Sequence, residues 1–119
     1  MKIKLFFIGS FLLLTFKCKS QVVVNDININ TIDSVSYCEI LGYDVGLFKK
    51  NLQILVDYGQ KLKYGEYNTI KDGNGKTKSF NSMVDALNFM EVNGWAYISS
   101  YALSVSTGGS VYHFLLKKK

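Results

Sequence analysis

Two residues of this 119-residue chain carry side chains that could form a nucleophile and its base. A catalytic Cys–His pair needs the Cys38 thiol and the His113 imidazole within hydrogen-bond reach of one another. Both residues fall inside runs that alternate as strands do, whereas catalytic groups concentrate on loops at the ends of elements. The pattern therefore favours a buried thiol and a structural histidine, and we assign no catalytic residue.

The sequence gives no basis for a metal or a cofactor. A transition-metal site needs several His or Cys ligands, and residues 21–119 hold one of each, His113 and Cys38. Asp72-Gly73-Asn74-Gly75 is too short and too poor in carboxylates for a calcium loop. Gly108-Gly109 lacks the spacing of a phosphate-binding loop. Glu39 and Asp57 can lie side by side across a hairpin. The ordinary explanation of such a pair is two solvated charges on the protein surface.

Aromatic residues supply the only candidates for binding. Trp95, Tyr97 and Tyr101 fall on one face of an expected strand, and such a row can stack against a glycan or a peptide. Alternating aromatic residues also pack inside sheets. These three residues are nevertheless the candidate ligand-binding or partner-binding residues.

The elements that would position these residues are mainly strands. Period-two alternation predicts two antiparallel hairpins; their strands are 35–45 with 52–58, and 95–105 with 111–116. The second hairpin turns at 107–110. An apolar stripe through Met83, Val84, Leu87 and Met90 predicts one helix between Asn81 and Asn93.

These elements predict an α+β fold, in which an antiparallel sheet of about four strands has one helix packed on one face. The expected order is β-β-(excursion)-α-β-β, where the excursion is the basic segment 59–79. A small hairpin of 67–71 against 76–80 is an open alternative there. One helix covers only about half of one sheet face, so residues 21–34, the excursion or a second molecule must cover the rest. Residues 21–34 form either an edge strand or an ordered arm, and the helix-free face or an exposed edge strand is a possible contact surface.

Residues 1–20 have the three parts of a secretory signal peptide: a basic start at Lys2 and Lys4, an apolar stretch over 5–16, and a small-residue cleavage site ending at Ser20. The apolar stretch is shorter than the ~20 residues of a membrane-spanning helix. A lipid anchor on Cys18 is the competing reading, disfavoured because Lys17 precedes it.

Removal of residues 1–20 changes the charge of the chain. All fourteen basic residues are lysines, four of them lie in this segment, and all nine acids lie beyond it. The remainder carries ten lysines against nine acids, so the basic footprint of a nucleic-acid-binding protein is absent. Its 99 residues suffice for one domain, 35–119, preceded by the 21–34 segment.

From Phe80 onward the chain resembles small exported proteins of Bacteroidetes-type bacteria. The resemblance rests on FNSMVDALNFM at 80–90, Gly94-Trp95 and YHFLLK at 112–117, with Tyr37-Cys38-Glu39 and Val56-Asp57-Tyr58-Gly59 also matching. It covers most of residues 35–119. It implies export and a compact α+β fold, and it carries no activity.

These observations favour a non-enzymatic, exported protein-interaction module, either inhibitor- or immunity-like or self-associating. It would be secreted or periplasmic, or lipid-anchored in the cell envelope if Cys18 is modified. A ligand-binding domain that uses an aromatic sheet face is the first alternative, and a small enzyme is the second.

Overall fold

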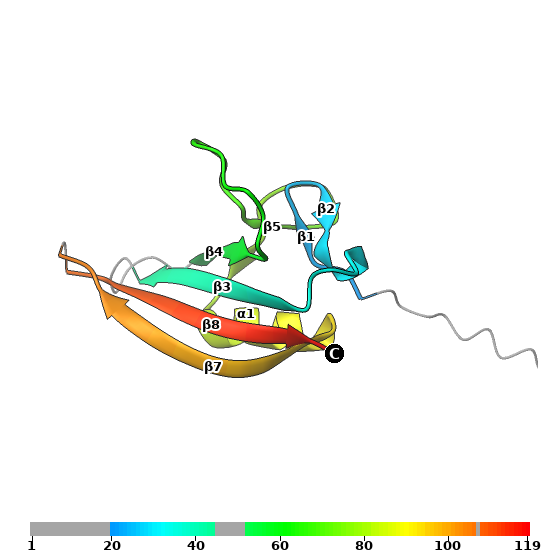
Figure 1. The fold of residues 1–119 in the computed structure, drawn as a ribbon. Helices are drawn as coiled ribbons and strands as arrows, with labels where there is room; N and C mark the ends of the chain where they lie inside the picture. Colours follow the sequence, from blue (N-terminus) through cyan, green and yellow to red (C-terminus); the bar gives the residue numbers. More distant parts are fainter. Residues whose placement is uncertain (1–19, 45–51, 107) are drawn as a thin grey trace, which may run out of the picture.

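The computed structural model describes residues 20–44, 52–106 and 108–119. Their main feature is a five-stranded antiparallel sheet in the order β6-β4-β3-β8-β7 (Figure 1). The strands are β3 (Tyr37–Asp44), β4 (Leu52–Asp57), β6 (Ser79–Phe80), β7 (Trp95–Ser104) and β8 (Ser110–Lys118). Residues 1–19 of the predicted signal peptide, Cys18 included, lie outside the described residues, as do the segment 45–51 between the strands of the first hairpin and residue 107 of the second hairpin's turn.

The antiparallel α+β architecture with one helix is as predicted, but the number and order of strands differ. Both expected hairpins form, since β3 pairs with β4 and β7 with β8. β6 adds a fifth strand beside β4. A separate three-stranded sheet of β2 (Ile27–Asn28), β1 (Val23–Val24) and β5 (Ile70–Lys71), in that order, stands at one end (Figure 1). These added strands have two residues each, too short for a period-two pattern to predict them.

Within the described residues, the one α-helix is α1 (Met83–Val92), which packs on one face of the sheet. Its N-terminus is capped reciprocally, because Ser82 Oγ accepts the N–H of Asp85 at 3.1 Å and the Asp85 carboxylate accepts the N–H of Asn81 at 2.9 Å. Gly94 follows with φ +91°, the left-handed conformation that ends helices. Ala86 and Met90 are its buried residues. Val84, which the predicted stripe included, is 62% exposed, since it lies about 100° around the helix from Met83.

Residues 21–34 form part of the core rather than a separate arm. They fold into β1 (Val23–Val24), β2 (Ile27–Asn28) and the 3₁₀ helix η1 (Ile29–Thr31). Val22, Val24 and Ile29 are fully buried in the same cluster as Ile40 and Trp95. The segment therefore supplies the cover that α1 alone cannot give to the sheet.

The excursion contains the small hairpin that the sequence left open. β5 (Ile70–Lys71) bridges to Thr77 across a turn in which the N–H of Asp72 donates to the Lys76 carbonyl at 2.7 Å. β5 also pairs with β1, and Ile70 is fully buried. The hairpin thus joins the 21–34 segment to the rest of the molecule.

A bulge in β7 corrects the predicted face of its aromatic residues. Pairing with β8 is shifted between Tyr97 and Ser99, so Tyr97 pairs with Leu116 but Tyr101 pairs with His113. One extra residue reverses the side chains that follow it. Trp95 and Tyr97 therefore lie on the helix side of the sheet, whereas Tyr101 and Leu103 lie on the other side.

Candidate functional site: the open face of the sheet

The face of the sheet turned away from α1 carries a row of aromatic and apolar side chains. At Gly42 a side chain would run into Met83 of α1, so the even-numbered residues of β3 face the helix and the odd-numbered residues face away. We call this second surface the open face. Its half-exposed members are Tyr37, Tyr43, Tyr101 and Leu103, with exposed fractions of 50%, 44%, 52% and 54%.

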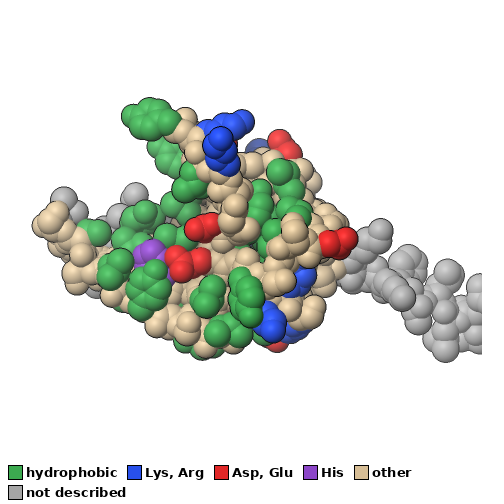
Figure 2. All heavy atoms as spheres, viewed as in Figure 1, with side chains coloured by type: hydrophobic (Ala, Val, Ile, Leu, Met, Phe, Trp, Pro, Cys, Tyr) green, Lys and Arg blue, Asp and Glu red, His purple; other side chains and the backbone are tan. Residues whose placement is uncertain are grey.

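Strand register brings these residues of β3 and β7 together on either side of β8. Leu41 of β3 lies opposite His113 of β8, which lies opposite Tyr101 of β7. Tyr43 lies opposite Val111, which lies opposite Leu103. Figure 2 shows the histidine among hydrophobic side chains, with an acidic side chain beside it. The open face is therefore a continuous apolar and aromatic surface with a polar centre.

That polar centre is an ion pair or hydrogen bond between Glu39 and His113. The Glu39 carboxylate oxygen lies 2.6 Å from His113 Nδ1, and the two side chains are 25% and 13% exposed. The Tyr101 ring stacks on the imidazole, with centroids 4.5 Å apart and planes 9° apart. The imidazole is thus held at its edge by Glu39 and on one face by Tyr101, and these two contacts set its orientation.

A second carboxylate lies beside Glu39. Asp57 of β4 is its direct partner across the β3–β4 hairpin, as the sequence suggested. Asp57 is exposed, and its carboxylate accepts the N–H of Gly59 at 2.9 Å. Lys117 lies over the ring of Tyr37, with its ammonium 5.6 Å from the centroid. The surface therefore combines aromatic rings with both signs of charge.

The Cys38 thiol is on the opposite side of the sheet from His113. Cys38 is buried in the core and pairs with Leu116, whereas His113 pairs with Leu41, an odd-numbered neighbour on β3. Burial, together with the nearby Asp57 charge, raises the pKa of the Cys38 thiol to about 12, although Lys118 opposes the shift. The two residues whose types suggest a nucleophilic pair are therefore separated by the sheet itself.

Only one of the three predicted binding residues belongs to the open face. Trp95 is fully buried, and its indole N–H donates to Asn30 Oδ1 at 3.0 Å. Tyr97 is 48% exposed but lies on the helix side, edge-on to Phe114. Tyr101 is the residue that the open face includes. The sequence did not predict the contact between Glu39 and His113. The one signal for it was Glu39 itself, a single charged residue on a strand face whose other residues are apolar or aromatic.

The Asp72 turn is stabilised by its own backbone. Asp72 Oδ1 accepts the N–H groups of Asn74 and Lys76 at 2.8 and 3.0 Å. Hydrogen bonds from Lys76 and Asn74 hold the pKa of the Asp72 carboxyl below its usual value.

Within the described residues, no three His, Cys, Asp or Glu side chains gather closely enough to hold a metal ion. In the same residues no helix is long and apolar enough to cross a membrane.

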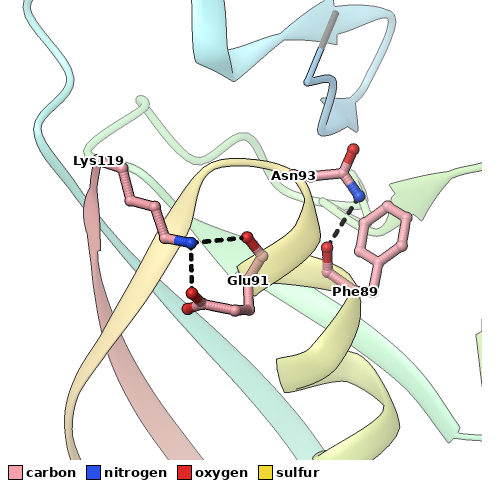
Figure 3. Close-up of polar contacts among 4 residues, drawn as sticks. All are labelled: Phe89, Glu91, Asn93 and Lys119. Carbon is pink, nitrogen blue, oxygen red and sulfur yellow. Dashed lines mark hydrogen bonds and ion pairs between the residues drawn. The ribbon is translucent and has the colours of Figure 1, made fainter. Parts of the chain in front are cut away.

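A shallow depression of about 570 Å³ lies where the end of α1 meets the chain terminus. Its lining includes Ser20, Asn30, Glu91 and Lys119. Figure 3 shows the Lys119 ammonium donating to both the carbonyl and the carboxylate of Glu91, and Asn93 Nδ2 donating to the Phe89 carbonyl. These contacts hold the last turn of α1 against the end of β8. The residues around the depression therefore have a structural role, which is to join these two elements.

Comparison of this chain with protein-family models, with curated proteins and with solved structures finds no match.

Proposed function

We propose that this protein is a non-enzymatic, exported interaction module that binds another protein through the open face of its sheet. One observation carries the proposal: half-exposed aromatic and apolar side chains of β3 and β7 flank the Glu39–His113 pair. Single exposed apolar residues are common, but contiguous groups with polar members are typical of interaction sites. Aromatic residues are also the side chains that most often dominate binding energy at interfaces.

The arrangement of the reactive groups supports a non-catalytic role. A thiol needs its thiolate form to act as a nucleophile, and the raised pKa of Cys38 leaves it neutral near pH 7. Among the described residues, the hydrogen-bond partner of His113 is Glu39, with no hydroxyl or thiol in its place. This geometry orients an imidazole without supplying a group for it to activate.

The proposal places the mature chain outside the cytoplasm, starting at Gln21. Intact-mass measurement of the protein recovered from its host tests this directly. A soluble species that begins at Gln21 supports export with cleavage after Ser20. A membrane-bound species that begins at a lipidated Cys18 would move the protein to the cell envelope and leave the open face as the proposed contact surface.

Site-specific photocrosslinking tests the open face. A photoreactive phenylalanine derivative at Tyr37 or Tyr43 of β3 should capture a partner in the host, whereas the same group at Val84 should not. Val84 is the matched control because it is 62% exposed on the far side, on α1. Once identified and purified, that partner should bind a Tyr37→Ser/Tyr43→Ser variant roughly ten- to a hundredfold more weakly than the unmodified protein. Equal capture from Val84, or unchanged affinity of the double variant, would contradict the proposal.

A glycan is the second candidate for the open face. The observation in its favour is Tyr101, which rests on His113 by one ring face and is 52% exposed. A ring held in this way can stack a flat ligand on its outer face. Nuclear magnetic resonance titration distinguishes glycan binding from protein binding. A glycan should shift the resonances of the Tyr101 ring protons, and it should leave a Tyr101→Ala variant unbound at the same concentrations. Trp95 fluorescence is unsuitable, since that indole is fully buried.

A further inference from the structure

The two edges of the five-stranded sheet differ in what covers them. On one edge, β4 pairs with β6 at Leu52 and Gln53. Farther along the same edge, Leu55 bridges to Thr69 and the N–H of Val56 donates to the Asn68 carbonyl at 2.8 Å. On the other edge, β7 pairs with β8 alone among the described residues (Figure 1). β7 therefore presents a row of backbone N–H and C=O groups that no described strand uses.

β7 lacks the features that normally protect such an edge. Edge strands are usually short, or carry lysine or proline, or twist away at a bulge. β7 has ten residues, and the sequence from Trp95 to Tyr112 contains neither a charged residue nor a proline. All eight residues from Tyr97 to Ser104 are exposed, on both faces. The bulge lies near the start of the strand, so Ser99–Ser104 remains regular over about 20 Å.

We propose that β7 pairs antiparallel with β7 of a second copy of this chain, across a two-fold axis perpendicular to the sheet. The pairing would join two five-stranded sheets into one of ten strands, with both α1 helices on the same side. The absence of charge is the argument for a second copy. A two-fold axis places a strand against itself, so any charge near the axis would meet its own sign, and Ser99–Ser104 has none.

The alternation of side chains limits the registers in which two copies of β7 can pair. Directly opposed residues of antiparallel strands point to the same face, so a two-fold axis must pass through a residue position. An axis at Ala102 places Tyr101 opposite Leu103 twice on the open face, with the smallest side chain at the axis itself. Aromatic–aliphatic cross-strand pairs of this kind stabilise sheets. The inference does not rest on the proposed function, because it concerns the edge of the sheet and its readout is the association of the protein alone.

Charge substitutions at Ala102 test the two-fold contact. The chain is expressed with its own N-terminal segment, recovered after export, and its molar mass measured by sedimentation equilibrium. We expect a dimer for the unmodified protein and a dissociation constant at least about tenfold higher for Ala102→Lys and for Ala102→Glu, since each would oppose like charges. An equimolar mixture of the two variants should recover the dimer. Val84→Lys adds the same charge on the exposed side of α1 and should leave the dimer intact.

Circular dichroism and thermal unfolding of each variant show whether it keeps the monomer fold. A second measurement avoids the charges: oxidation of Ala102→Cys with diamide should give a disulfide-linked dimer, whereas Val84→Cys should not, and the buried Cys38 should not interfere. A monomeric unmodified protein at high micromolar concentration would overturn the inference. So would charge variants that remain dimeric, or a mixture that fails to associate. Pairing of β7 with an extended segment of another protein would appear as a heteromer and would overturn it equally.

Discussion

At the scale of single residues, Asn30 joins three parts of the chain through one carboxamide. Its Oδ1 accepts the N–H of Val22 at 3.2 Å and the indole N–H of Trp95 at 3.0 Å. Its Nδ2 donates to the carbonyl of Asn93 at 2.6 Å. This one side chain thus holds together the 21–34 segment, the end of α1 and the start of β7. Nothing in the local sequence distinguishes Asn30 from the asparagines near it.

Replacing Asn30 with alanine should lower the free energy of unfolding by about 2–3 kcal/mol, since three hydrogen bonds are lost and the Trp95 indole N–H is left buried without its acceptor. Urea unfolding followed by Trp95 fluorescence measures the change. Asn88→Ala, an exposed asparagine on α1, is the control and should change stability by less than about 0.5 kcal/mol. Equal effects of the two substitutions would show that Asn30 does not link these segments.

The buried Cys38 thiol gives the protein a pH dependence in alkaline solution. Its pKa is raised from 9.0 to about 12, chiefly by burial. As pH rises from about 9 towards 12, the unfolded chain therefore loses this proton before the folded chain does. The stability that the neutral thiol contributes is present in full below pH 9, and it declines above pH 9. Urea unfolding at pH 7, 9 and 10.5 should show a steeper loss for the unmodified protein than for Cys38→Val. Parallel declines would show that the Cys38 thiol does not cause the loss of stability.

At the scale of elements, α1 is a short helix that depends on its ends. It has ten residues, fewer than isolated helices need to be stable in water. Ser82 accepts the N–H of Asp85 in its first turn, and the Asp85 carboxylate accepts the N–H of Asn81 just before the helix. Asn93, Gly94 and Lys119 close the last turn. Met83, its first residue, approaches Gly42 of β3 so closely that a methyl group at Gly42 would collide with the Met83 sulfur.

The Ser82 cap should contribute about 1 kcal/mol to stability. Ser82→Ala removes the acceptor for the Asp85 N–H and should lower the urea midpoint accordingly. Ser82→Asp keeps an acceptor at the same place and adds a negative charge at the N-terminal end of the helix dipole, so it should retain most of the stability. A loss as large in Ser82→Asp as in Ser82→Ala would show that side-chain capping does not hold this end of α1.

At the scale of the whole molecule, one core unites segments that are distant in the sequence. The core cluster includes Val22 and Ile29 from the first segment, Ile70 from the excursion hairpin, and Leu116 from β8. The chain terminus is tied in as well, because Lys118 Nζ donates to the Ile32 carbonyl at 2.8 Å. The described parts of residues 21–34 and 35–119 therefore form a single packed unit.

Two isoleucines of the 21–34 segment test this unity. Ile29 is fully buried, whereas Ile27 is 45% exposed. Ile29→Ala should cost about 2–5 kcal/mol, a large part of the stability of a small domain, and Ile27→Ala should cost under about 1 kcal/mol. Thermal or urea unfolding measures both. A small effect of Ile29→Ala would mean that this segment is dispensable to the core.

The sequence by itself determined the α+β class, both long hairpins and the helix, because period-two and period-3.6 patterns and the turn residues Asn93-Gly94 and Gly108-Gly109 act over a few residues. Tertiary structure alone decided the rest. The even face of β3 is buried because α1 and the 21–34 segment converge on it. The bulge after Tyr97 places Tyr101 on the opposite face from Trp95, and it could not be predicted because it depends on the register of β7 against β8. Glu39 and His113 are 74 positions apart in the sequence, and their contact exists only when β3 and β8 become neighbours in the folded sheet.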